Sequence, residues 1–97
     1  MKFLVLWSLA IERLSEPMLK AVLRVPEYAK PLEQQGKIEK RYHVVGKHGG
    51  AWIFNVESNE ELERLLAMSP VFNYSRYEVI PLAEMESPLD VIQKGAN

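Results

Sequence analysis

A glycine-rich turn between two apolar segments constrains the fold of this chain more than any other feature. The turn is Gly46-Lys47-His48-Gly49-Gly50, and the segments on either side of it are rich in β-branched and aromatic residues. This pattern predicts a β-hairpin, because glycine adopts positive φ without a clash at Cβ. We therefore expect strands over residues 37–46 and 50–57, with the three glycines allowing the chain to reverse tightly.

A helix is predicted directly after this hairpin. Residues 57–61, Glu-Ser-Asn-Glu-Glu, offer a capping residue followed by carboxylates, which the positive end of a helix dipole favours. Leucines at helical spacing then predict a helix from Asn59 to Met68. It should end at Ser69-Pro70, because proline disfavours a helical residue before it. Residues 76–83 are predicted to form the last strand.

The N-terminal segment, residues 2–10, is predicted to be a central strand. Both of its faces are apolar apart from Ser8, which is typical of a strand that is covered on both sides. A chain of 97 residues can cover one face with its own helices. Covering the other face needs a partner, so we expect a homodimer or a larger homo-oligomer.

The first helix is predicted to begin at Ser15-Glu16-Pro17, with a capping hydroxyl and a proline in the first turn. Pro26 and Pro31 interrupt the pattern, since each removes a backbone donor. We expect a kinked helix, or two short helices, ending at Gly36. The buried stripe is predicted to consist of Met18, Val22, Val25, Ala29 and Leu32.

The predicted order of elements is β-α-β-β-α-β, the ferredoxin-like arrangement of the α+β class. Helices should cover one face of the antiparallel sheet. We expect a single domain over residues 1–97, in which the tail, residues 86–97, docks on a partner subunit.

Composition excludes several classes of function. The net charge of −1 argues against a nucleic-acid-binding surface, and the absence of cysteine excludes disulfides and thiolate chemistry. The apolar segment from Phe3 to Ile11 is too short to cross a membrane, which takes roughly 20 residues. A cytoplasmic protein with neither a nucleic-acid nor a membrane partner is expected.

Three motifs resemble the muconolactone delta-isomerase family, whose members are dimeric α+β barrels. They are Val44-Val45-Gly46, the run Ile-Phe-Asn-Val-Glu-Ser-Asn-Glu-Glu-Leu at 53–62, and the run Leu-Ala-Met-Ser-Pro-Val-Phe-Asn-Tyr at 66–74. The resemblance covers about Leu19 to Leu82. It implies an isomerase that moves a double bond within a lactone ring, with a small-molecule ligand and without a metal or cofactor.

Such an isomerisation needs an acid/base group and a hydrogen-bond donor for the developing enolate oxygen. The family carries a lysine and a glutamate on its first helix. Aligning this chain with the family at Gly36, without a gap, places Val22 and Val25 at those two positions. A non-catalytic ligand-binding or assembly module on the same scaffold is therefore an alternative. A third possibility is a cofactor-independent monooxygenase of the same barrel type.

Acid/base work is assigned to His43, because imidazole titrates near neutrality. Arg41 could bind a carboxylate through its fork of donors, although an exposed strand arginine is the ordinary interpretation. Tyrosines are expected to line the pocket, and a kink between the two prolines could turn Tyr28 toward a cavity. The predicted substrate-binding set is Arg41, Tyr42, His48, Phe72 and Tyr74, to which Tyr77 could be added as a lining residue.

Overall fold

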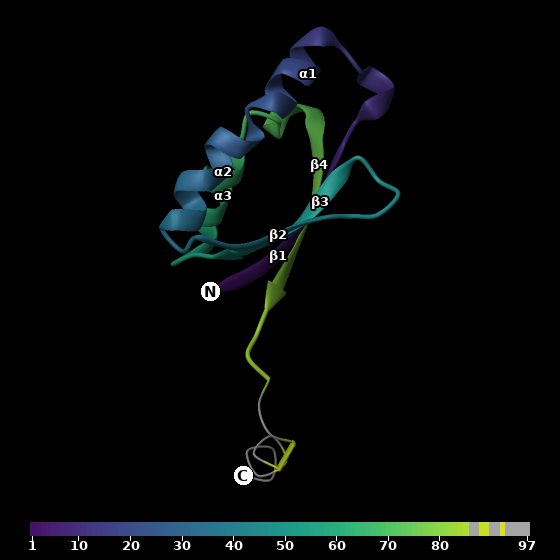
Figure 1. Ribbon diagram of the computed structural model, residues 1–97. Coiled ribbons are helices and arrows are strands. Elements are labelled where there is room, and N and C mark those ends of the chain that lie inside the picture. The colour runs from purple at the N-terminus through teal and green to yellow at the C-terminus, as the bar shows by residue number, and fades with distance from the viewer. Residues whose placement is uncertain (86–87, 90–91, 93–97) are drawn as a thin grey trace.

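The computed structural model describes residues 1–85, 88, 89 and 92, and its main feature is a twisted sheet with helices on one face (Figure 1). The elements are β1 (Lys2–Leu9), η1 (Ile11–Arg13), α1 (Glu16–Leu23), α2 (Val25–Gln34), β2 (Ile38–His43), β3 (Gly49–Asn55), α3 (Asn59–Ala67), η2 (Phe72–Tyr74) and β4 (Ser75–Leu82). The prediction that the tail docks on a partner falls largely outside the described residues.

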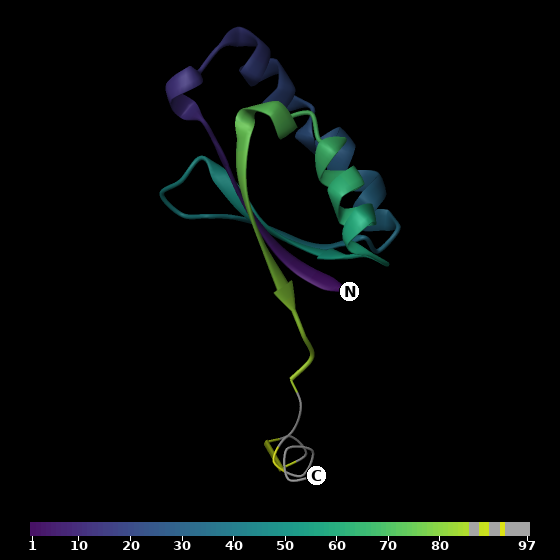
Figure 2. The same cartoon turned by 180° about the vertical axis from the view of Figure 1, so that it is seen from behind.

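The sheet has the strand order β2-β3-β1-β4, and every neighbouring pair is antiparallel. This order and the β-α-β-β-α-β succession confirm the predicted ferredoxin-like α+β fold. Seen from behind, α2 and α3 lie side by side over the sheet (Figure 2). The central strands are β1 and β3, so β1 occupies the position expected from its doubly apolar sequence.

The core lies between the sheet and the helices. Phe3 and Val5 of β1 and Phe54 of β3 are almost fully buried there, and they contact a cluster that includes residues of α2 and α3. The predicted stripe of the first helical region is confirmed, because Met18, Val25, Ala29 and Leu32 are buried and Val22 is half-buried. The shared hydrophobic surface therefore fixes where α2 and α3 sit on the sheet.

Both predicted helix starts are confirmed by side-chain caps. The Oγ of Ser15 accepts a hydrogen bond from the backbone N–H of Met18 at 3.2 Å. The Oγ of Ser58 accepts one from the N–H of Glu61 at 3.1 Å. Each cap satisfies a backbone donor that has no partner within its helix.

The first helical region consists of two short helices, one of the two predicted outcomes. The break is at Arg24, and Pro26 lies in the first turn of α2, where its missing N–H needs no partner. Pro31 lies inside α2 and does not end it. The segment stops at Gly36, whose φ of 75° is the left-handed conformation typical of a helix C-terminus.

The hairpin differs from the prediction in its glycines. β2 ends at His43 and β3 begins at Gly49, so both strands are shorter at the turn than expected. Within the turn only Gly46 has a positive φ, at 83°. Gly49 and Gly50 belong to β3, and they are needed because the neighbouring strands leave no room for a Cβ.

A bulge interrupts the side-chain alternation of β2. The register shifts between Ile38 and Lys40, so the side chains beyond the shift change face. Ile38 and Tyr42, which an unbroken alternation would place on one face, therefore lie on opposite faces. Arg41 pairs with Trp52, and His43 shares its face, the one that the helices cover.

The opposite face of the sheet carries no helix among the described residues. It is largely apolar near its centre, where Leu4, Leu6, Ala51, Ile53 and Ile80 remain partly exposed. The expectation that β1 is covered on both sides is thus met on one side within a single chain. No helix in the described part of the chain is long and apolar enough to cross a membrane.

We predict that Gly49→Ala destabilises the protein far more than Gly46→Ala. A Cβ at Gly49 would overlap the carbonyl oxygen of Trp7 and lie 2.8 Å from the Cα of Ser8, both on the β1 backbone. At Gly46 a Cβ meets nothing within 4 Å, and only the left-handed backbone is penalised, by about 1–2 kcal/mol. Urea denaturation measures both variants, and equal losses would contradict the close-approach argument.

Candidate functional site

An open groove runs along the helix-covered side of the sheet, between the N-terminal helices and the β2–β3 edge. Its volume of about 590 Å³ is within the range of small-molecule sites. It is lined by Trp7, Val22, Val25, Pro26, Glu33, Glu39, Lys40, Arg41, Tyr42, His43 and Trp52. Two of the predicted site residues, Arg41 and His43, are therefore brought together here, whereas Tyr42 borders the groove with its side chain on the opposite face of the sheet.

Arg41 is held in this groove by two contacts. Its Cζ lies 5.4 Å from the ring centroid of Trp52, and its Nη2 lies 2.8 Å from Oε1 of Glu33 on α2. The cation–π contact and the ion pair hold the guanidinium over the indole. A cation fixed in this way can bind a carboxylate with little loss of side-chain entropy.

Glu33 is a functional candidate that sequence reasoning missed. Its signal was its position four residues after Ala29, which places it on the side of α2 that faces the sheet. Its ion pair with Arg41 could not be predicted, because the register of β2 after the bulge is what places Arg41 opposite Trp52. Val22 and Val25, at the positions where the family resemblance implies charged residues, form an apolar wall of the same groove.

His43 is the last residue of β2 and lies directly opposite Gly50 of β3. It is exposed to solvent on the groove side, so its imidazole is accessible to water or to a ligand. Gly50 has no side chain that could pack against the imidazole. The predicted acid/base candidate therefore lies on a strand rather than on the first helix.

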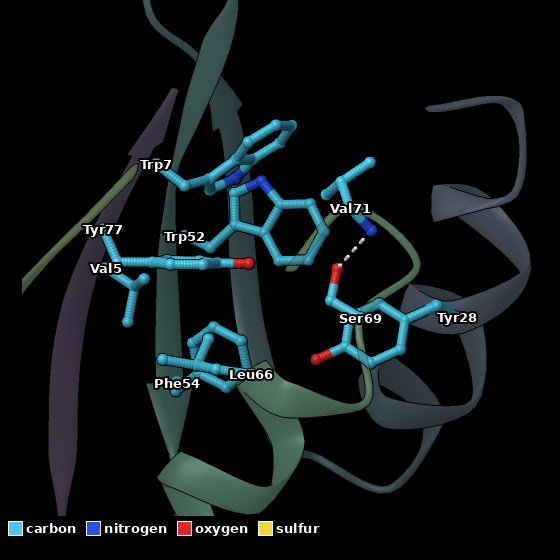
Figure 3. Close-up of a pocket in the computed structure, with 9 residues that line it drawn as sticks. All are labelled: Val5, Trp7, Tyr28, Trp52, Phe54, Leu66, Ser69, Val71 and Tyr77. Atoms are coloured by element: carbon cyan, nitrogen blue, oxygen red, sulfur yellow. Dashed lines mark hydrogen bonds between the residues drawn. The ribbon is translucent and has the colours of Figure 1, made fainter. Parts of the chain in front are cut away.

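A second, smaller cavity lies between the sheet and the helices (Figure 3). Its volume of about 10 Å³ is close to the minimum for one water molecule. The lining residues are Val5, Trp7, Tyr28, Trp52, Phe54, Leu66, Ser69, Val71 and Tyr77. Trp7 and Trp52 also line the groove, and their rings meet edge to face with centroids 5.7 Å apart. The two indoles therefore separate the groove from this inner cavity.

Two tyrosines of the inner cavity are held in the neutral form. Burial raises the pKa of Tyr28, whose hydroxyl donates to the carbonyl oxygen of Leu65 and so joins α2 to α3. Burial also raises the pKa of Tyr77, and the hydroxyls of Ser69 and Ser75 partly oppose that rise. Both phenols therefore keep their protons to a higher pH than an exposed tyrosine.

The remaining predicted site residues lie away from the groove. His48 is exposed in the hairpin turn. Phe72 packs on Tyr77 with ring centroids 5.7 Å apart, and Tyr74 is half-buried against the core. Tyr77 and Tyr28 line a cavity, as their sequence positions suggested, but it is the inner one. Among the described residues, no three histidine, aspartate or glutamate side chains form a group that could hold a metal ion.

We predict that the two tyrosines make the protein sensitive to alkaline pH. Because their pKa values are raised on folding, the unfolded chain releases these protons first, and stability falls as pH rises above the ordinary value of 10.0. Tyr28→Phe should cost about 1 kcal/mol at neutral pH through the lost bond to Leu65, and should flatten the alkaline decline. Urea denaturation at pH values of about 8 and about 11 measures both effects. An unchanged alkaline slope in the variant would contradict the assignment.

Comparison with known proteins gives consistent results in sequence and in structure. Residues 1–87 match the family model described as Muconolactone delta-isomerase. The muconolactone delta-isomerase of Cupriavidus pinatubonensis is 39% identical over 66 residues, which are 68% of this chain and 72% of that protein. The enzyme of Rhodococcus opacus is 31% identical over 84 residues, which are 84% of this chain and 90% of that protein.

The fold agrees with a solved structure of the same family. A crystal structure of muconolactone isomerase superposes with a TM-score of 0.78 at 24% identity, covering 92% of this chain and 95% of that one. At this identity the superposition supports the fold, and the sequence matches support the family. From the matched residues and the shared architecture, the chain belongs to the muconolactone delta-isomerase family.

Proposed function

We propose that this protein is a cofactor-independent isomerase that moves a proton on a carbonyl-containing, lactone-like small molecule. The observation that carries the proposal is the convergence of Arg41 and His43 in one groove of a muconolactone delta-isomerase fold. The groove combines an apolar helix wall with a fixed cation and a titratable imidazole. These are the parts needed to orient an anionic ring and to exchange a proton with it.

Arg41 orients the substrate in this proposal. A lactone that carries a carboxylate would place that group on the guanidinium, which is already positioned by Trp52 and Glu33. The ring would then lie against the apolar wall formed by Val22 and Val25. Because binding through a carboxylate is equal in the ground state and the transition state, losing Arg41 should raise KM more than it lowers kcat.

His43 moves the proton. In its neutral form the imidazole takes a proton from the carbon next to the carbonyl, and the resulting imidazolium returns one at the conjugated position. A binding role for Tyr42, whose side chain lies on the opposite face of the sheet, stays a prediction. Binding roles for His48, Phe72 and Tyr74, none of which lines the groove, stay predictions, as does a cytoplasmic location.

Self-association is part of the proposed function. The uncovered face of the sheet carries a central row of apolar side chains, including Leu6 and Ile53, which are only half-buried in the single chain. A second copy of this chain is the partner that fits, because two equivalent apolar sheet faces are self-complementary. A homodimer or a larger homo-oligomer would bury this surface by sheet-to-sheet packing.

Activity tests the proposal directly. Wild-type protein should isomerise muconolactone, followed by the change in ultraviolet absorbance, and His43→Gln should lower kcat by about 100-fold or more. Lys30→Gln, on the exposed side of α2, is the matched control and should keep wild-type kcat and KM. Saturable binding of muconolactone without turnover would instead favour a ligand-binding module, and neither binding nor turnover would refute the proposed substrate class.

Sedimentation tests the self-association. Wild-type protein at micromolar concentration should sediment as a dimer or larger, whereas Leu6→Lys should shift it toward single chains, because a buried charge without a partner opposes association. Leu19→Lys, on an exposed position of α1, serves as the control. A folded wild-type monomer at that concentration would contradict the proposal.

A further inference from the structure

Glu33 carries a negative charge at a position where its own helix does not favour one. It lies in the last turn of α2, a turn that contains no basic residue. The C-terminal end of a helix dipole is negative, so a carboxylate there is unfavourable by itself. The stability of α2 therefore does not account for this charge, whose ion-pair partner lies outside the helix.

That partner is Arg41, the cation of the groove. Oε1 of Glu33 lies 2.8 Å from Nη2 of Arg41, and both residues line the groove. The Arg41 side chain is 32% exposed and the Glu33 side chain 38%, so a ligand in the groove can reach both charges. Trp52 holds the guanidinium from a second direction, with Cζ 5.4 Å from the ring centroid. Arg41 would thus keep its place over the indole without the Glu33 charge.

The other charged residues that line the groove are directed elsewhere. The carboxylate of Glu39 lies 3.4 Å from Nζ of Lys2. Lys40 comes directly before Arg41 in the regular part of β2, so its side chain lies on the opposite face of the sheet. Before a ligand binds, the formal charges of Glu33 and Arg41 therefore cancel in the part of the groove where a carboxylate would bind.

We propose that Glu33 is a specificity-determining residue that weakens the binding of anionic ligands to Arg41. This inference rests on the proposed function, in which the ligand carboxylate binds the guanidinium. A guanidinium has five N–H donors, so it can contact the Glu33 carboxylate and a ligand carboxylate at once. The two carboxylates then lie close together and repel each other. The groove therefore selects its ligand by the ring that packs on Val22 and Val25 more than by charge.

Two effects of Glu33 oppose each other, and their sizes decide the sign. Glu33 helps to hold Arg41 in place, but an ion pair between partly exposed side chains contributes little, and the Trp52 contact remains without it. Two carboxylates about 5 Å apart in a partly exposed site repel enough to weaken binding by about 4–10-fold. Removing the Glu33 charge should therefore strengthen the binding of anions.

Kinetics should show opposite effects for the two partners of the ion pair. A carboxylate contact is the same in the ground state and the transition state, so Glu33→Gln should lower KM for muconolactone by about 4–10-fold and leave kcat unchanged. Arg41→Gln should raise KM. A residue that only supported the fold would raise KM or lower kcat when replaced. Folding should tolerate Glu33→Gln, because the substitution removes an unfavourable charge from the end of α2.

A binding cycle tests the inference without relying on turnover. The probes are furan-2-carboxylate and furan-2-carboxamide, which have the same ring and differ by one charge. Nuclear magnetic resonance titration of the ¹⁵N-labelled full chain measures the Kd of each probe for wild type and for Glu33→Gln. The substitution should lower the Kd of the carboxylate by about 4–10-fold and leave the Kd of the carboxamide unchanged. Raising NaCl from about 50 mM to about 500 mM should reduce this gain, because salt screens the repulsion.

Two further variants serve as controls. Glu27→Gln removes one negative charge from an exposed position of the same helix, and Glu27 does not line the groove, so both Kd values should stay at the wild-type level. Glu33→Asp keeps the charge and should bind the carboxylate as wild type does. An equal gain in Glu27→Gln would assign the effect to the net charge of the chain and would overturn the inference. Unchanged or weaker carboxylate binding in Glu33→Gln, or no saturable binding, would overturn it as well.

The outcomes separate this inference from the proposed function. If wild-type protein isomerises muconolactone and Glu33→Gln does not bind the carboxylate more tightly, the role of Glu33 is refuted and the proposed function stands. If wild-type protein does not turn over muconolactone, but Glu33→Gln binds the carboxylate more tightly and the carboxamide equally well, the role of Glu33 stands and the proposed substrate is wrong.

Discussion

The close contact between β1 and β3 is the constraint on which the rest of the structure depends. Gly49 and Gly50 allow the backbone of β3 and the side chains around it to approach β1 where larger residues would collide. That contact seats the Trp7 and Trp52 rings against each other on the helix-covered face. The position of these rings then determines where the groove ends and where the inner cavity begins.

The groove has one apolar wall and one polar wall. α1 and α2 contribute an aliphatic wall, whereas β2 contributes Arg41 and His43. The arginine is held by an aromatic face and by the carboxylate of Glu33, so its position does not depend on a ligand. In the proposed function, Arg41 and His43 of β2 take the roles of the two charged residues that the family carries on its first helix, where this chain has Val22 and Val25.

The sequence was sufficient for the fold because each local signal agreed with the next. Ser15 and Ser58 cap helices where expected, Pro26 separates α1 from α2, and Gly36 ends the helical segment. The details of the site were less accessible. A bulge depends on pairing between strands rather than on the pattern within one strand, so the sequence alone could not show that Ile38 and Arg41 lie on the same face. The contact of Arg41 with Glu33 joins residues from two elements and leaves no periodic signal.

The bulge in β2 also has a consequence for how such a chain can change over time. One extra residue between Ile38 and Lys40 decides whether the strand presents its arginine and histidine, or its tyrosine, to the helices. Deleting a single residue there would reverse the faces of one end of the strand relative to the other end. The chemical character of the groove is thus encoded in a residue count as well as in residue identities, and relatives with the same fold can diverge in activity through strand length alone.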